Sequence, residues 1–405
     1  MKVLMFGWEF PPFNSGGLGT ACFGLTRGLS KHDVDVTFVL PRKVDIDVDF
    51  LKMVFGDETK SVIKKQYFVN SPLQAYATEE SYEYRLSEEE KKTKQIYGNN
   101  LFEEVERYGA IGGQIAEQEE FDIIHAHDWL TYKAAIAAKK VSGKHLVVHV
   151  HATEFDRGGG NEVNQYVYNI EKKGMEEADT VIAVSNLTRN RIIESYGIAP
   201  EKVRVVHNAV EFENYALDQM HELKKTKKIV LFLGRLTLQK GPDYFVAAAK
   251  KVLEYYPDVI FVVAGSGDME KATIRRVAEL GIADKFIFTG FLRGKDIHEA
   301  YQMADLYVMP SVSEPFGITP LESLMCGTPV LISHQSGVSE VLTHCLKTDF
   351  WNTDEMANKI VSILRHGELH KTLKENGVKE VKKFSWKEPA ARCIDIYDQT
   401  LGRKN

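Results

Sequence analysis

The sequence alternates short apolar runs with helical segments, and polar or glycine-rich loops follow the apolar runs. Apolar runs of this length, bounded by such loops, predict strands that are buried on both faces of a sheet. Parallel strands need crossover helices between them, so the alternation predicts an α/β fold with parallel sheets. The expected strands are residues 2–6, 35–40, 121–129, 146–150, 180–185, 203–210, 229–234, 259–264, 286–289, 305–310 and 329–333.

The alternating series occurs twice, and a chain of 405 residues is long enough for two domains with a core each. Residues 211–228 are charged and lack strong periodicity, so they predict an interdomain linker. We expect a first domain over 1–210 and a second over 229–385. The simplest architecture is two doubly wound, Rossmann-like domains that face each other across a cleft.

The formal charge is −6, and the acidic excess lies in the first half of the chain. No basic tail or stripe is present, which predicts no nucleic-acid partner and no docking on an anionic membrane. No apolar run approaches the roughly 20 residues that span a bilayer, and the first residues predict a strand rather than a signal peptide. Four cysteines without zinc or redox spacing predict buried free thiols. We therefore expect a cytoplasmic protein with no stable membrane insertion.

Residues 45–120 differ from the regular alternation. An acidic and aliphatic segment is followed by a highly charged run over 78–94 and then by a helical apolar stripe over 99–116. This pattern predicts an elaborated surface region followed by a packed helix. The charged run is typical of a solvated face, and no motif supports an acceptor-binding role for it.

The stretch Glu314–Glu322 joins a buried strand to a helix. Thr319 fits the N-cap, Pro320 the first helical position and Glu322 the third position of a capping box. The free amide groups at such a helix start attract phosphate. Glu322 is then either a capping partner alone or also a ligand contact. Glu314 follows a buried strand, where open α/β sheets bind ligands.

Arg235 and Lys240 lie five positions apart in the loop after the strand 229–234. Charged groups directly after an apolar strand emerge at the carboxyl edge of the sheet, which argues against a role as surface charge alone. Two cations and a helix N-terminus suit a diphosphate, because charge-assisted hydrogen bonds are strong. A carboxylate close by suits the hydroxyl groups of a ribose or a sugar.

A glycine-rich turn follows the first strand and includes Gly16 and Gly17. Its glycine spacing does not fit a dinucleotide fingerprint, and no Lys-Ser/Thr follows it as in a P-loop. The two glycines permit a ligand to approach the backbone closely above the helix start. Tight packing of the loop on the helix is the alternative interpretation.

Two neighbouring strand ends contain clusters of histidine and acidic residues. His125 and His127 end one strand; on the next, His149 and His151 share a face by alternation. His151 lies at the carboxyl end, where a functional role competes with that of a satisfied core residue. A zinc site from His125, His127 and His151 is conceivable. No fixed helical or cysteine spacing supports it, so we predict no metal site.

Taken in order, these segments resemble retaining GT-B glycosyltransferases of family 4, near the glycogen and starch synthase branch. Residues 234–241 are very similar to that branch's donor loop, and residues 314–322 match the family's E-x7-E motif. Gly16-Gly17-Leu18 resembles the N-terminal glycine loop, while 125–129 and 151–154 resemble the strand ends of the first domain. The resemblance spans nearly the whole chain.

The resemblance implies a nucleotide-sugar donor, UDP- or ADP-glucose, held mainly by the second domain. Arg235 and Lys240 would hold the diphosphate, Glu322 would accept from the ribose hydroxyls, and Glu314 and His151 would contact the transferred sugar. The α-linkage would be retained without a metal or another cofactor. The last helix, within 386–405, would cross back onto the first domain. The implied donor-binding residues are Gly16, Gly17, Arg235, Lys240, Gly317, Ile318 and Glu322.

The sequence also departs from the glycogen and starch synthases. Asn14 replaces their lysine before the paired glycines, Glu322 is an acid that they usually lack, and Ser336-Gly337 replaces a second glycine pair. The donor base, the sugar and an α-glucan acceptor therefore stay open. A lipid or surface-polysaccharide precursor is the alternative acceptor, against which the acidic first half argues. The motif residues disfavour a donor-binding protein without catalysis, and no feature favours an epimerase or a pyridoxal-phosphate phosphorylase.

Overall fold

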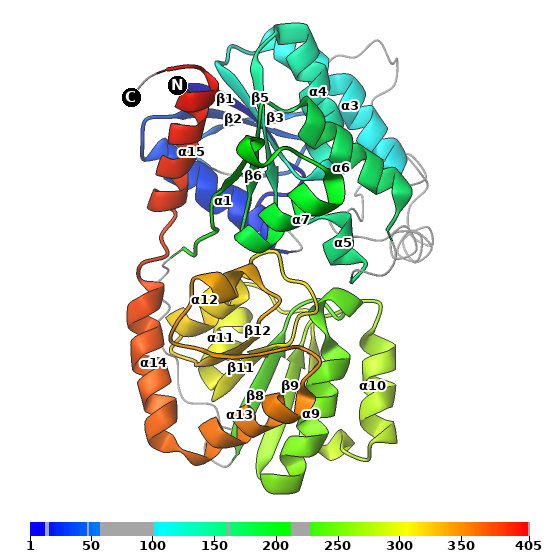
Figure 1. Ribbon diagram of the computed structural model, residues 1–405, viewed down its shortest axis with the longest axis vertical. Helices are drawn as coiled ribbons and strands as arrows, with labels where there is room; N and C mark the ends of the chain where they lie inside the picture. Colours follow the sequence, from blue (N-terminus) through cyan, green and yellow to red (C-terminus); the bar gives the residue numbers. More distant parts are fainter. Residues whose placement is uncertain (13–15, 47, 57–100, 160–162, 212–226, 404–405) are drawn as a thin grey trace. The chain divides into compact units, whose positions relative to one another are not determined.

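A computed structural model describes residues 1–12, 16–46, 48–56, 101–159, 163–211 and 227–403. The chain forms two compact units (Figure 1). The first contains Met1–Glu154, Val163–Asn208 and Trp386–Asn405, and the second contains Phe155–Glu162 and Ala209–Ser385. Most of the predicted linker and residues 57–100 of the predicted surface region lie outside the described residues.

The first unit is built on a seven-stranded parallel sheet with the order β3-β2-β1-β4-β5-β6-β7. The order reverses between β1 and β4, because β2 and β3 extend the sheet on one side and β4 to β7 on the other. Ligands of doubly wound folds bind beyond the strand ends at such a reversal. The strands are β1 (Lys2–Phe6), β2 (Asp35–Leu40), β3 (Lys52–Phe55), β4 (Ile123–His127), β5 (His145–Val150), β6 (Thr180–Ala183) and β7 (Val203–Val205).

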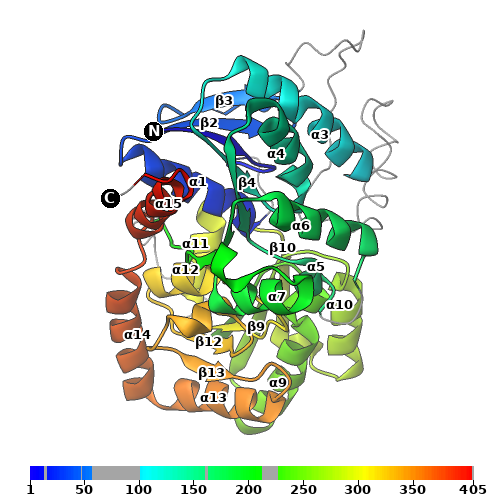
Figure 2. The ribbon, with the colours of Figure 1, turned by 45° about the horizontal axis from the view of Figure 1, so that its top comes forward.

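Crossover helices cover this sheet, and the last helix of the chain joins them. Helix α15 packs on α1, although the two come from opposite ends of the sequence (Figures 1 and 2). The contact is close because α1 presents glycines: a Cβ on Gly24 would overlap the Trp386 indole. The helices are α1 (Gly17–Ser30), α3 (Leu101–Gln118), α4 (Trp129–Ser142), α6 (Gln165–Glu177), α7 (Asn186–Tyr196) and α15 (Lys387–Thr400), and the short α5 (Glu154–Arg157) leads into the second unit.

The second unit is built on a six-stranded parallel sheet with the order β10-β9-β8-β11-β12-β13, which reverses between β8 and β11. Its core joins β8, β9 and β11 to the apolar faces of α9 and α13. The strands are β8 (Lys228–Leu233), β9 (Val259–Ala264), β10 (Phe286–Gly290), β11 (Leu306–Met309), β12 (Val330–Ser333) and β13 (Leu346–Thr348). The helices are α9 (Pro242–Tyr255), α10 (Glu270–Glu279), α11 (Lys295–Met303), α12 (Thr319–Met325), α13 (Thr353–Arg365) and α14 (Gly367–Val381).

The α/β prediction with two doubly wound, Rossmann-like domains is confirmed, and the differences concern edges and boundaries. The sequence analysis missed the edge strands β3 and β13, which are only partly buried and so lack a long apolar run. Helix α1 begins at Gly17 rather than at residue 20, because Leu18 and Ala21 already belong to its buried face. Among the described residues, no helix is long and apolar enough to cross a bilayer.

Candidate active site

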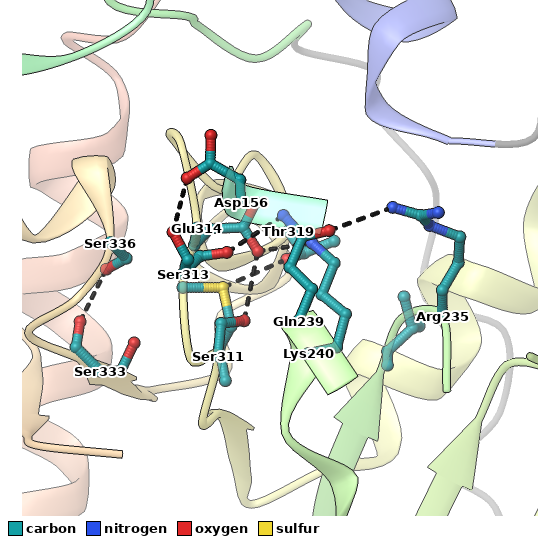
Figure 3. A network of polar contacts seen from close by, with 12 residues as sticks. Asp156, Arg235, Gln239, Lys240, Ser311, Ser313, Glu314, Thr319, Ser333 and Ser336 are labelled. Carbon is teal, nitrogen blue, oxygen red and sulfur yellow. Dashed lines mark hydrogen bonds and ion pairs between the residues drawn. The ribbon is translucent and has the colours of Figure 1, made fainter. Parts of the chain in front are cut away.

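An ion pair lies at the strand reversal of the second unit. Lys240, in the loop after β8, places Nζ 2.5 Å from Oε2 of Glu314, in the loop after β11 (Figure 3). Ser311 donates a second hydrogen bond to the same oxygen at 3.2 Å. The side chains are 21% and 8% exposed, so water screens this pair only in part. The structure thus joins two of the residues that the sequence analysis selected.

The backbone around Glu314 is fixed by the neighbouring loop after β12. The Glu314 amide donates to the Gln335 carbonyl at 2.9 Å, and the Glu314 carbonyl accepts from the Gly337 amide at 2.9 Å. Gly317 has a φ of +98°, where a Cβ would lie 3.1 Å from the Glu314 side chain. Glycine is therefore required for the turn that places this carboxylate.

Gln239 connects Arg235 to the same turn, a role that the sequence analysis missed. Its side-chain amide donates to the Ser313 carbonyl at 3.0 Å, and its own main-chain carbonyl accepts from the Val312 amide at 2.9 Å. Arg235 donates to Oε1 of Gln239 at 3.4 Å (Figure 3). A glutamine in a short loop gives no sequence signal of burial, since only the fold brings the loop after β11 over it.

The amides of Gly317 and Ile318 donate no hydrogen bond to any group in the described parts of the chain. Both residues are buried, and buried amides normally have an acceptor. The two amides are thus available to an anion.

Ser313, in the same turn, donates to Asp156 at 2.5 Å. This contact attaches residues 155–159 to the second unit, although the sequence analysis placed them in the first domain.

The predicted capping box is wrong. Helix α12 starts at Thr319 after Ile318, and no side chain caps it. Instead, Tyr301 donates to Glu322 at 3.0 Å, and the Tyr307 hydroxyl lies 2.9 Å from the Thr319 hydroxyl. These two tyrosines come from α11 and β11, so tertiary contacts replace the local motif.

Glu322 nevertheless stays a candidate ligand contact. Burial raises the pKa of its carboxyl above the ordinary value, and the hydrogen bond from Tyr301 opposes that shift only in part. The residue as a whole is half-buried rather than enclosed, so a ligand can reach it. A carboxylate with a raised pKa at a strand reversal is typical of functional sites, although structural carboxylates show such shifts too.

In the first unit, His151 is held at the end of β5 by two neighbours. The His127 Nδ1 lies 2.9 Å from the His151 Nε2, and Asp128 accepts the His151 amide at 2.6 Å. Burial lowers the pKa of His151 to about 3, so its imidazole is neutral near pH 7. A neutral imidazole can donate or accept a hydrogen bond without adding charge.

Asp128 is a second residue that the sequence analysis left without a role. It adopts a φ of +58°, which is uncommon for a residue other than glycine. Its carboxylate also accepts the Ala152 amide at 3.3 Å, so it supports the whole turn after β5. An acid directly after a strand end was the available signal. Its positive φ cannot be inferred from the sequence.

Gly16 and Gly17 lie at the start of α1, Gly16 as the residue before the helix and Gly17 as its first residue. A Cβ on Gly17 would meet no described heavy atom within 4 Å. Tight packing of loop on helix therefore does not explain this glycine within the described residues. Close approach of a ligand stays a prediction.

Comparison with known proteins places these features in a family. Residues 215–380 match the model described as glycosyl transferases group 1, and residues 108–214 match the one described as Glycosyltransferase Family 4. An uncharacterised glycosyltransferase of Methanocaldococcus jannaschii is 30% identical to the chain over 98% of both. Glycogen synthase of Mycobacterium tuberculosis is 25% identical over 84% of this chain and 80% of its own length.

A solved structure has the same fold. HepE of Anabaena, crystallised with UDP-glucose, superimposes with a TM-score of 0.70 at 18% identity, over 98% of this chain and all of its own. At this identity the likeness shows the fold alone. Together with the two sheets described above, it identifies the arrangement as GT-B.

Proposed function

Because the chain belongs to glycosyltransferase family 4 and is a glycosyltransferase with the GT-B fold, we propose that it transfers glucose from UDP- or ADP-glucose to a carbohydrate acceptor with retention of the α-linkage. The observation that supports this most is the contact between Lys240 and Glu314 at the strand reversal. It combines a cation for the diphosphate with an acceptor for sugar hydroxyls at the edge where α/β sheets bind ligands.

The diphosphate would be bound by the cations and amides of one turn. Lys240 has three N–H donors, so it can keep its bond to Glu314 and donate to a phosphate oxygen as well. Arg235 would add a planar donor group, and Gly317 and Ile318 would contribute their amides. These groups would stabilise the negative charge that develops on the leaving diphosphate.

The sugar would lie against Glu314. Within the described residues, Lys240 and Ser311 both bond to Oε2 of this carboxylate, so Oε1 is available to accept from a sugar hydroxyl. Neutral His151 would contact the sugar from the first domain, and Glu322 would accept from the ribose. With retention, the acceptor oxygen bonds to the anomeric carbon on the face that the diphosphate leaves, and the acceptor's proton passes to a departing phosphate oxygen.

This arrangement needs no metal ion for the transfer step. Arg235, Lys240 and the two amides would supply the positive potential that a divalent cation provides in other phosphate sites. The UDP-glucose complex of HepE supports UDP-glucose as the first donor to test, and the resemblance to the glycogen and starch synthases, with the glycogen synthase relative, adds ADP-glucose. The identities of HepE and the glycogen synthase relative to this chain, 18% and 25%, leave the choice to experiment.

The experiment is a donor screen followed by a transfer assay. UDP-, ADP- and GDP-sugars are tested for thermal stabilisation, and stabilising donors are then incubated with maltooligosaccharides in the presence of EDTA. We expect stabilisation by UDP- or ADP-glucose and, by NMR of the anomeric proton, an α-linked product. A β-linked product would refute retention, and activity restored only by added metal would refute the metal-independent step. Transfer to lipid or surface-polysaccharide precursors but not to maltooligosaccharides would favour the alternative acceptor.

A further inference from the structure

Four histidine rings are stacked inside the first unit, at the ends of β4 and β5. The register pairs His127 with His149, so alternation brings His125, His127, His149 and His151 onto one face. The rings of His125 and His127 lie 4.5 Å apart, and each is 5.4 Å from the ring of His149. The three are at most 2% exposed. The proposed transfer reaction uses only His151 of this group.

Hydrogen bonding leaves part of this group without a partner. His125 Nδ1 contacts the Tyr397 hydroxyl on α15, and His127 Nδ1 contacts His151 Nε2. Within the described residues, no group bonds to His125 Nε2, to His127 Nε2 or to either nitrogen of His149. Buried polar atoms without partners are rare and costly, so four in one cluster require an explanation.

Protonation does not supply that explanation. Positive charges packed in one buried cluster would repel one another, and burial disfavours a charged imidazole. The rings are therefore treated as neutral imidazoles. When Nδ1 of His125 and of His127 carries the proton and donates it to its partner, Nε2 presents a lone pair. Neutral imidazole nitrogens of this kind are common metal ligands.

We propose that His125, His127 and His149 bind one divalent transition-metal ion, with Zn²⁺ as the expected occupant. One nitrogen from each ring lies within 4.8 Å of the others. Three points no farther apart than this fit in a circle of about 2.8 Å radius, against zinc–nitrogen bonds of about 2.0–2.1 Å. Ring shifts of about 0.7 Å would be needed, together with rotations that turn the in-plane lone pairs toward one point, because the three rings lie within 29° of parallel. Imidazole ligands suit zinc better than they suit magnesium or calcium.

The partners of two of the three proposed ligands fit this assignment, whereas the second nitrogen of His149 has no acceptor among the described residues. Metal-binding histidines usually donate their other ring N–H to a fixed acceptor, which sets the tautomer and the ring orientation. Tyr397 and His151 occupy that position for His125 and His127. Three imidazoles leave one tetrahedral position for a water molecule or hydroxide.

The ion would cross-link β4 to β5 and, through Tyr397, orient α15. It would also hold His127, which in turn positions His151. This role differs from that of a catalytic metal at the diphosphate, because the ligands belong to the first unit and the predicted diphosphate contacts belong mostly to the second. Chelation is expected to lower stability without removing a group that contacts the donor.

The test uses the whole chain, produced without a polyhistidine tag in medium with zinc. Mass spectrometry of the purified protein should find about one equivalent of zinc, and Co²⁺ added to the stripped protein should give the visible absorption of a tetrahedral site. Dipicolinate should lower the melting temperature, and zinc should restore it. His149→Gln should lose the metal. The control His145→Gln should keep it, since that ring lies on the same strand but is half-exposed beside Asp179.

Wild-type protein without a transition metal, both as purified and after incubation with Zn²⁺ or Co²⁺, would overturn the proposal. The unpartnered nitrogens would then be bridged by water. Equal metal content in His149→Gln and wild type would also overturn it, because the ion would lie elsewhere. The wild-type measurement decides the question even when a variant fails to fold.

Discussion

Lys240 and Glu314 form an ion pair across the strand reversal of the second sheet, although 74 positions separate them in the sequence. The sequence analysis selected Lys240 as a contact for the diphosphate and Glu314 as a contact for the transferred sugar. The structure joins them in one ion pair. A ligand phosphate therefore meets a cation already oriented by a carboxylate, which lowers the cost of ordering the lysine side chain on binding.

The ion pair predicts that loss of Lys240 lowers the free energy of unfolding modestly and turnover strongly. Lys240→Met leaves Glu314 largely buried without its cation, and we expect the free energy of unfolding to fall by about 1–3 kcal/mol. Turnover should fall by about 100-fold or more, since a donor to the leaving group is lost. Urea denaturation and initial rates measure the two effects.

A double variant serves as the control for that experiment. Lys240→Met with Glu314→Gln removes both charges, so part of the lost stability should return while transfer stays low. Wild-type turnover in Lys240→Met would refute its role in binding the diphosphate.

Arg235 should affect activity with little effect on stability. Its bond to Gln239 is long, at 3.4 Å, and the side chain is only partly buried. Arg235→Ala is expected to change the free energy of unfolding by about 0.5 kcal/mol or less. It should lower kcat/KM by about 100-fold, and Arg235→Lys should recover only part of the loss because the planar donor pair is missing.

The matched control is Arg276→Ala on α10, where the arginine is more than half exposed in a pair with Glu279. Its kinetics should equal those of the wild type. Unaltered kcat/KM in Arg235→Ala would contradict the role of Arg235.

Donor affinity should depend on pH through Glu322. A ribose hydroxyl donates well to the ionised carboxylate, and the pKa of Glu322 is raised above the ordinary value. Affinity for the nucleotide sugar should therefore weaken as pH falls through this raised pKa, at a higher pH than an ordinary glutamate would require. Calorimetric titrations at several pH values below 7.5 would measure it.

Glu322→Gln should remove this pH dependence and bind the donor more weakly at pH 7.5. The variant keeps an oxygen that can accept from Tyr301, so the fold should be retained. Identical affinities of variant and wild type at every pH would leave Glu322 a structural role only.

Gly17→Ala tests whether Gly17 is needed for packing of the loop or for close approach of the donor to the backbone. The added Cβ has free space among the described atoms, and alanine favours helix over glycine by up to about 1 kcal/mol. We expect an unchanged or higher melting temperature together with weaker donor binding. A variant as stable as the wild type that binds the donor equally well would show that Gly17 is not a ligand contact.

Much of the fold was accessible from the sequence, because strands buried on both faces need continuous apolar runs. The strands β1, β8 and β9 were predicted on this basis at or within one residue of their observed bounds. The edge strands β3 and β13 were not, since partly buried strands lack that signal. The family resemblance followed from short motifs, and the family is confirmed by the comparisons.

The sequence by itself determined which residues end the strands, and therefore which polar groups reach the ligand-binding edge of each sheet. Only the tertiary structure decided how they combine. Strand order brings Lys240 to Glu314. Tyr301 and Tyr307, from other elements, hydrogen-bond to Glu322 and Thr319 in place of the expected capping box. The register of β4 with β5 adds His149 to the histidine cluster. Each contact joins segments far apart along the chain, and local pattern contains no information about which loops the sheet will place side by side.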